Sequence, residues 1–102
     1  MAEKVQVNRA LLGEFCRRNH IAQLSFFGSV LRDDFTPESD IDVLVVFEDG
    51  RTPGFLEVAR IERELSVILD NRKVDLRTFQ DLSRYFRSEV LASAEVQYAQ
   101  AR

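Results

Sequence analysis

Apolar residues recur along this chain with two periods, one typical of helices and one typical of strands. Residues 8–19 place apolar side chains at helical spacing, with Asn8 at a capping position and Asn19 near the expected end. The helical period returns over residues 55–70, and it returns again over residues 82–90. The sequence therefore predicts helices in these three stretches.

Three further stretches have the length and composition of strands. They cover residues 22–27, residues 40–47 and residues 73–78. Residues 43–47 are apolar without polar alternation, so we expect both faces of that strand to be covered. Helices that alternate with strands predict an α/β (α+β) fold, with a small mixed sheet of about three strands flanked by helices.

Composition narrows the class of protein. The chain has 102 residues, of which 45% are hydrophobic, and no repeat or linker divides it, so we expect a single domain over residues 1–102. A net charge of −3 argues against an extended nucleic-acid ligand but permits a small anionic one. The single cysteine, Cys16, lies on the apolar face of the first predicted helix. Since no apolar run approaches the ~20 residues of a membrane span, we expect a cytoplasmic protein without membrane contact.

Candidate chemistry begins with carboxylates at the start of the most apolar strand. Asp40 and Asp42 are two residues apart, so their side chains leave one face of the strand with Cα atoms about 6.5 Å apart. Such carboxylates repel each other unless a divalent cation neutralises them. Asp75, on the polar face of the next strand, completes the cluster if the two strands are neighbours. Taken singly, these residues also fit solvated strand ends, and Asp75 fits a surface pair with Lys73 or Arg77.

A glycine and a serine precede these carboxylates. Gly28 and Ser29 stand at a predicted strand-to-helix turn, where a small residue lets backbone N–H groups approach an anion closely. Alone, such a pair is also an ordinary glycine turn with a serine N-cap. More specific is the order of all the candidate residues within one small domain: Gly28-Ser29-x-x-Arg32, then Ser39-Asp40-Ile41-Asp42, then Asp75.

This order resembles the DNA polymerase β-like nucleotidyltransferase superfamily, and within it the minimal nucleotidyltransferase (MNT) family, from about Leu24 to Arg77. The resemblance implies a Mg²⁺-dependent enzyme that transfers a nucleoside monophosphate, AMP from ATP, to an acceptor. It implies that Asp40 and Asp42 hold two Mg²⁺ ions, and that Asp75 completes the catalytic metal site and helps to deprotonate the acceptor. The NTP would be bound by the other motif residues, Gly28, Ser29, Arg32 and Ser39.

The resemblance also implies a partner, since a chain this short leaves little material for a second substrate-binding domain. In the MNT family the partner is commonly a HEPN-domain ribonuclease toxin, and the MNT protein acts as antitoxin by adenylylating a toxin tyrosine. Two alternatives stay open: a catalytically silent antitoxin that masks its partner, and a small-molecule (aminoglycoside-like) adenylyltransferase. A homo-oligomer also stays open.

One residue departs from the family pattern. Many members carry a small residue directly after the arginine, and this chain has Asp33 there. A carboxylate pointing into the pocket would weaken triphosphate binding, which favours the silent alternative, whereas one pointing outward would be harmless. Arg32 itself also fits a surface ion pair with Asp33 or Asp34.

Overall fold

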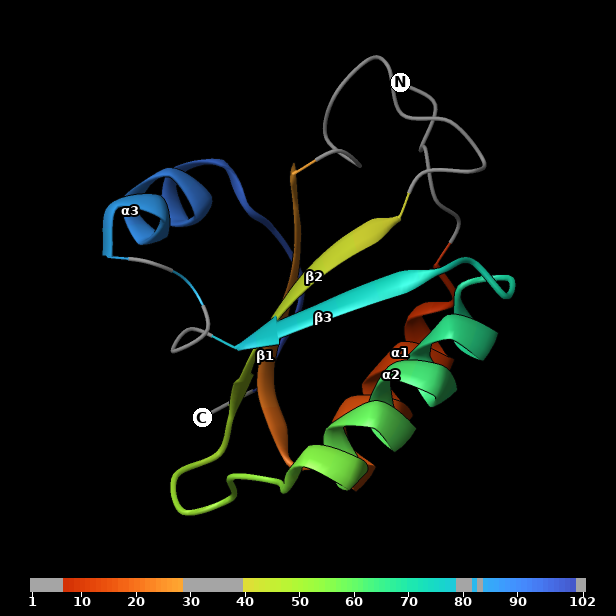
Figure 1. The fold of residues 1–102 in the computed structure, drawn as a ribbon. Coiled ribbons are helices and arrows are strands. Elements are labelled where there is room, and N and C mark those ends of the chain that lie inside the picture. Colours follow the sequence, from red (N-terminus) through yellow and green to blue (C-terminus); the bar gives the residue numbers. More distant parts are fainter. Residues whose placement is uncertain (1–6, 29–39, 79–81, 83, 101–102) are drawn as a thin grey trace.

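The computed structural model describes residues 7–28, 40–78, 82 and 84–100, and for residues 85, 86 and 91 it describes the backbone alone. The described elements are, in chain order, α1 (Arg9–Arg18), β1 (Ile21–Phe27), β2 (Ile41–Phe47), α2 (Phe55–Ile68), β3 (Val74–Thr78), α3 (Arg84–Ser93) and β4 (Glu95–Ala99) (Figure 1). Within these ranges no helix is both long and apolar enough to cross a membrane. The predicted helices and the three predicted strands are confirmed, with bounds that differ by a few residues.

The strands form one mixed sheet in the order β3-β2-β1-β4. β1 pairs with β2 and β4 in antiparallel fashion, whereas β2 and β3 are parallel. A parallel pair needs a crossover connection, and α2 supplies it between β2 and β3. α1 and α2 pack side by side against one face of the sheet, and α3 lies on the other face (Figure 1).

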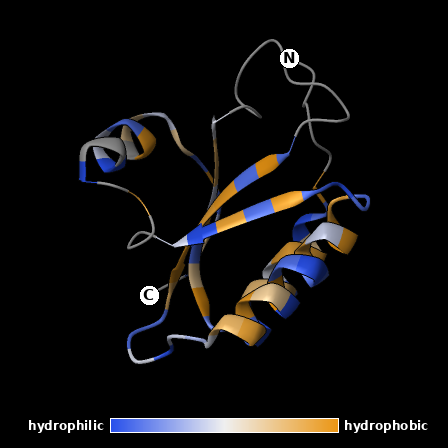
Figure 2. Ribbon diagram, viewed as in Figure 1, coloured by the Kyte–Doolittle hydropathy of each residue, from blue (hydrophilic) through white to orange (hydrophobic). Residues whose placement is uncertain are grey.

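β2 is hydrophobic over most of its length (Figure 2), and successive side chains of a strand point to opposite faces of the sheet. Val43 and Val45 belong to the larger core beneath α1 and α2, whereas Leu44 packs with Val90 of α3 in a smaller core. The expectation that both faces of this strand are covered is wrong at Val46, which is 42% exposed. Val46 shares the face of Leu44, and the smaller core that includes α3 does not extend to it.

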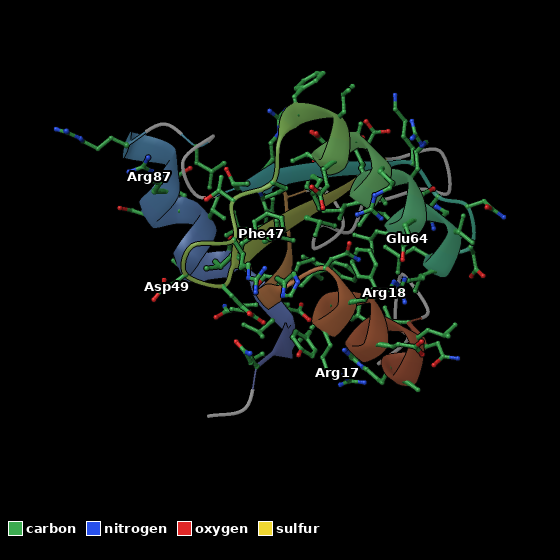
Figure 3. The ribbon with its side chains drawn as sticks, turned by 90° about the horizontal axis from the view of Figure 1, so that it is seen from below. Arg17, Arg18, Phe47, Asp49, Glu64 and Arg87 are labelled. Atoms are coloured by element: carbon green, nitrogen blue, oxygen red, sulfur yellow. The ribbon has the colours of Figure 1, made fainter. Side chains whose placement is uncertain are left out.

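Local signals in the sequence account for the two ends of α1. The side chain of Asn8 accepts a hydrogen bond from the Leu11 N–H at 3.1 Å, and Asn19 is the C-cap. Cys16 is fully buried in the larger core, as expected, and burial raises the pKa of its thiol to about 12. Arg18 forms an ion pair with Glu64 of α2, and Figure 3 shows the two side chains meeting between the helices.

The fourth strand, β4, corrects the prediction of about three strands. It follows α3 directly and pairs with β1 at the edge of the sheet. Its five residues are half-buried or exposed, with Val96 54% exposed, so they carry little of the apolar pattern that marks a buried strand. Arg9 of α1 covers part of this edge by donating a 3.0 Å hydrogen bond to the Gln97 carbonyl.

Two positions on α2 provide a test of this packing. Leu65 is fully buried, whereas Val67 on the same helix is 67% exposed. We expect Leu65→Ala to lower the free energy of unfolding by about 2–5 kcal/mol, because it leaves a cavity in the larger core. Val67→Ala should change it by less than about 0.5 kcal/mol. Urea unfolding followed by circular dichroism measures both, and equal losses would contradict the assignment of the core face.

Candidate active site

The parallel register between β2 and β3 brings two of the candidate carboxylates together. Asp42 is the cross-strand partner of Asp75, and neighbouring strands lie about 4.8 Å apart. Both residues lie on the face opposite α1 and α2, because Val43 and Leu76 next to them belong to the larger core. Asp40 directly precedes β2 and is half-buried. The expectation that the two strands are neighbours is confirmed.

Gly28 closes the site from the side of β1. The antiparallel register places Phe27 opposite Asp42, so that Gly28 comes next to this carboxylate. A Cβ atom at Gly28 would lie only 2.4 Å from Asp42 Oδ2, and the φ of Gly28 is +72°. Both the space and the backbone conformation therefore require glycine at this position. Gly28 and Asp42, which lie in separate parts of the sequence motif, are therefore in direct contact.

Basic side chains lie beside two of the carboxylates. Arg77 Nη2 is 3.1 Å from Asp75 Oδ2, and Lys73 Nζ is 3.9 Å from Asp40 Oδ2. Of the two partners considered for Asp75, Arg77 is therefore the one in contact. All four side chains are partly exposed, so solvent screens both pairs, and they are weak.

The donor set fits a hard divalent cation. Mg²⁺ prefers carboxylate oxygens, and Asp42 and Asp75 offer them from adjacent positions on one face, with the absent side chain of Gly28 leaving room for the Asp42 carboxylate. The described part of the chain contains no group of three His, Cys, Asp or Glu side chains gathered closely enough to hold a metal. Ser29, Arg32 and Ser39, together with Asp33, lie outside the described residues.

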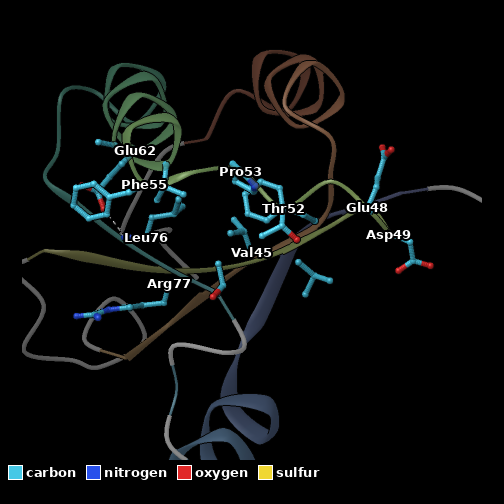
Figure 4. Close-up of a pocket in the computed structure, with 15 residues that line it drawn as sticks. Val45, Glu48, Asp49, Thr52, Pro53, Phe55, Glu62, Leu76 and Arg77 are labelled. Carbon is cyan, nitrogen blue, oxygen red and sulfur yellow. Dashed lines mark hydrogen bonds between the residues drawn. The ribbon is translucent and has the colours of Figure 1, made fainter.

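A groove of about 850 Å³ opens at the other end of β2 and β3 (Figure 4). Its lining includes Val45, Leu76 and Phe55, together with the turn that follows β2, and Phe55 is 87% exposed. Glu62 of α2 accepts a 2.9 Å hydrogen bond from the Leu76 N–H there. Sequence reasoning missed this groove because it arises from how α2 packs against the strand ends. None of Asp40, Asp42 and Asp75 lines this groove, whereas Arg77, which contacts Asp75, does.

His20 takes no part in the carboxylate site. It follows the C-cap of α1 with a φ of 58°, and its backbone N–H donates to the Arg17 carbonyl at 3.3 Å. Its Nδ1 is 3.6 Å from Glu48 Oε1. Because His20 lies at the opposite end of β1 from Gly28, it is remote from Asp42.

Comparisons with known sequences agree with this geometry. Residues 9–97 match the nucleotidyltransferase domain family. A Methanocaldococcus jannaschii protein proposed to be a protein adenylyltransferase is 30% identical over 77 residues, which are 76% of this chain and 80% of that protein. A second protein of that organism, with the same proposed activity, is 40% identical over 58 residues, and the match spans 57% of its length.

Solved structures share the fold. A protein proposed to be a minimal nucleotidyltransferase superposes with a TM-score of 0.67 at 36% identity, over 83% of each chain. A toxin–antitoxin structure with AMP-PNP gives 0.72 at 22% identity, over 92% of this chain and 75% of that one, which is a likeness of fold alone. The resemblance inferred from the motif order is thus confirmed, and the chain belongs to the nucleotidyltransferase domain family and is a nucleotidyltransferase.

Proposed function

We propose that this protein is a Mg²⁺-dependent protein adenylyltransferase, which transfers AMP from ATP to a tyrosine of a HEPN-domain toxin and thereby acts as its antitoxin. The observation that carries the proposal is the in-register pair of Asp42 and Asp75, with Gly28 packed against the first of them. This arrangement places hard oxygen ligands beside a glycine turn, a combination that suits a nucleoside triphosphate with its cations.

Each motif residue has a part in this chemistry. Asp40, Asp42 and Asp75 would hold the cations, which neutralise charge on the phosphate oxygens when they are bound. The tyrosine oxygen attacks the α-phosphorus of ATP, the bond to the β-phosphate oxygen breaks, and pyrophosphate leaves. Asp75 would accept the tyrosine proton. The turn at Gly28 and Ser29, with Arg32 and Ser39, would hold the phosphates.

Three observations support a protein as the acceptor. Phe55 and Leu56, which begin α2, are 87% and 81% exposed, and exposed apolar side chains of this size are often covered by a partner. The solved structures that share the fold include an MntA–HepT toxin–antitoxin complex, with a TM-score of 0.64 at 20% identity. The relatives proposed to be protein adenylyltransferases point to the same class of acceptor.

Label transfer from α-³²P-ATP with Mg²⁺ tests the function. We expect wild-type protein to label one protein in an extract of the source cells, and mass spectrometry to find AMP on a tyrosine of it. Asp42→Asn should lower the rate at least about 100-fold, since removal of charge stabilisation at a transferring phosphate costs rates of this order.

Asp49→Asn is the matched control, because it makes the same chemical change in the exposed turn at the other end of β2. It should keep the wild-type rate. If Asp42→Asn labels the acceptor as fast as wild type, the site assigned here is wrong. If no protein is labelled, while the partner is still neutralised by a variant with both Asp40 and Asp42 changed to Asn, the protein is a masking antitoxin.

Gly28→Ala should damage the site without unfolding the protein. The new Cβ would displace the Asp42 carboxylate, so we expect the affinity for AMP-PNP with Mn²⁺ to fall at least about 10-fold, as when a metal site loses a well-placed supporting group. Gly50→Ala is the control, since Gly50 has a similar φ of +76° but no atom within 4 Å of the added Cβ. It should carry the same backbone strain and bind as wild type. Isothermal titration calorimetry compares the two, and equal losses would assign the effect to strain alone.

A further inference from the structure

One face of β3 carries both a candidate metal ligand and basic side chains. Alternate residues of a strand share a face, so Lys73, Asp75 and Arg77 project together on the side of the sheet that carries Asp42. The residues between them, Val74 and Leu76, belong to the larger core on the other side. The side chain of Arg77 leaves the strand on the opposite side from Leu76 and Glu62 (Figure 4).

Arg77 is the closer of the two cations. Its Nη2 atom is 3.1 Å from Asp75 Oδ2, compared with 3.9 Å between Lys73 Nζ and Asp40 Oδ2. Its side chain is 49% exposed, whereas that of Lys73 is 81% exposed. Arg77 donates one hydrogen bond to Asp75, from Nη2 to Oδ2, so the contact is not bidentate. Such a contact neutralises the carboxylate, yet solvent competes with it and it opens easily.

The position of Arg77 has an electrostatic consequence for the site. Asp42 and Asp75 are cross-strand neighbours, so their negative charges repel each other unless a cation lies close to them. In this structure the Arg77 guanidinium is such a cation at Asp75. A divalent ion approaching the same oxygen atoms meets both an occupied carboxylate and a positive charge beside it.

We propose that Arg77 is a built-in counter-ion of Asp75, which neutralises this carboxylate while no metal is bound and must leave it when a metal binds. Arg77 thereby sets the metal concentration at which the site assembles. It is a positioning residue, since it acts through Asp75. The inference rests on the proposed function, because that function gives Asp75 its role as a metal ligand.

Binding of Mn²⁺ alone, measured by electron paramagnetic resonance without nucleotide, tests this role. We expect Arg77→Gln to bind Mn²⁺ about five-fold or more tightly than wild type at 50 mM KCl, because a competing charge is removed. The gain should shrink to less than about two-fold at 500 mM KCl, where exposed charges are screened. Arg77→Lys keeps the charge but loses the planar fork, so its affinity should lie between the two.

Arg17→Gln is the matched control for the loss of one positive charge. Arg17 is exposed in the last turn of α1 (Figure 3), and α1 packs on the face of the sheet opposite to the face that carries Asp75. This variant should bind Mn²⁺ within about two-fold of wild type, since within the described residues Arg17 makes no contact with the carboxylates, and solvent screens an exposed charge on the other face of the sheet. Thermal unfolding verifies that each variant is folded. If Arg77→Gln is unfolded, the Mn²⁺ affinity of Arg77→Lys is compared with that of wild type instead.

The outcomes separate this inference from the proposed function. Suppose that Arg77→Gln binds Mn²⁺ no more tightly than wild type, while Asp42→Asn abolishes Mn²⁺ binding. This result would overturn the counter-ion role of Arg77 and support the metal site. If neither wild type nor any Arg77 variant shows Mn²⁺ binding that is lost on Asp42→Asn, the metal site itself is wrong, and the inference fails with it. A gain in Arg77→Gln that persists unchanged at 500 mM KCl would also contradict the electrostatic explanation.

Discussion

The parallel pairing of β2 with β3 is the constraint on which both the core and the site depend. The pairing begins where the Ile41 N–H donates to the Lys73 carbonyl at 2.8 Å, and it places Asp42 beside Asp75. A slip of one residue would turn the apolar side of β3 toward solvent and set Asp42 against Val74 or Leu76. Core packing and site assembly therefore select the same register.

The site concentrates negative charge where the fold can tolerate it. The carboxylates lie at the start of β2 and β3, where they are half-buried rather than enclosed, so water and nearby cations offset their repulsion. Gly28 contributes by having no side chain, which leaves the Asp42 carboxylate its place. The same fold thus combines a well-packed face beneath α1 and α2 with a charged, half-buried strand end on the other face.

Periodicity predicted most of the fold, and motif order predicted the family. The helices and the first three strands follow from apolar spacing, and chain order predicted that β2 and β3 are neighbours, but not the register that pairs Asp42 with Asp75. β4 was not predicted, because an exposed edge strand buries too few apolar side chains to produce a recognisable hydrophobic pattern in the sequence. The contact between Gly28 and Asp42 and the groove beside Phe55 depend on register and packing between distant segments, which local patterns do not encode. The roles of Ser29, Arg32 and Ser39, and the effect of Asp33, stay predictions.

The central claim, a metal site built by the register of β2 and β3, is tested most directly by paramagnetic broadening of backbone amide signals on titration with Mn²⁺. The account predicts that the amides of Gly28, Asp42 and Asp75 broaden first and that the amide of Gly50, in the turn beyond the other end of β2, is spared. Broadening that begins instead at the acidic groove residues Asp49 and Glu62, or that spreads evenly over exposed carboxylates, would contradict it.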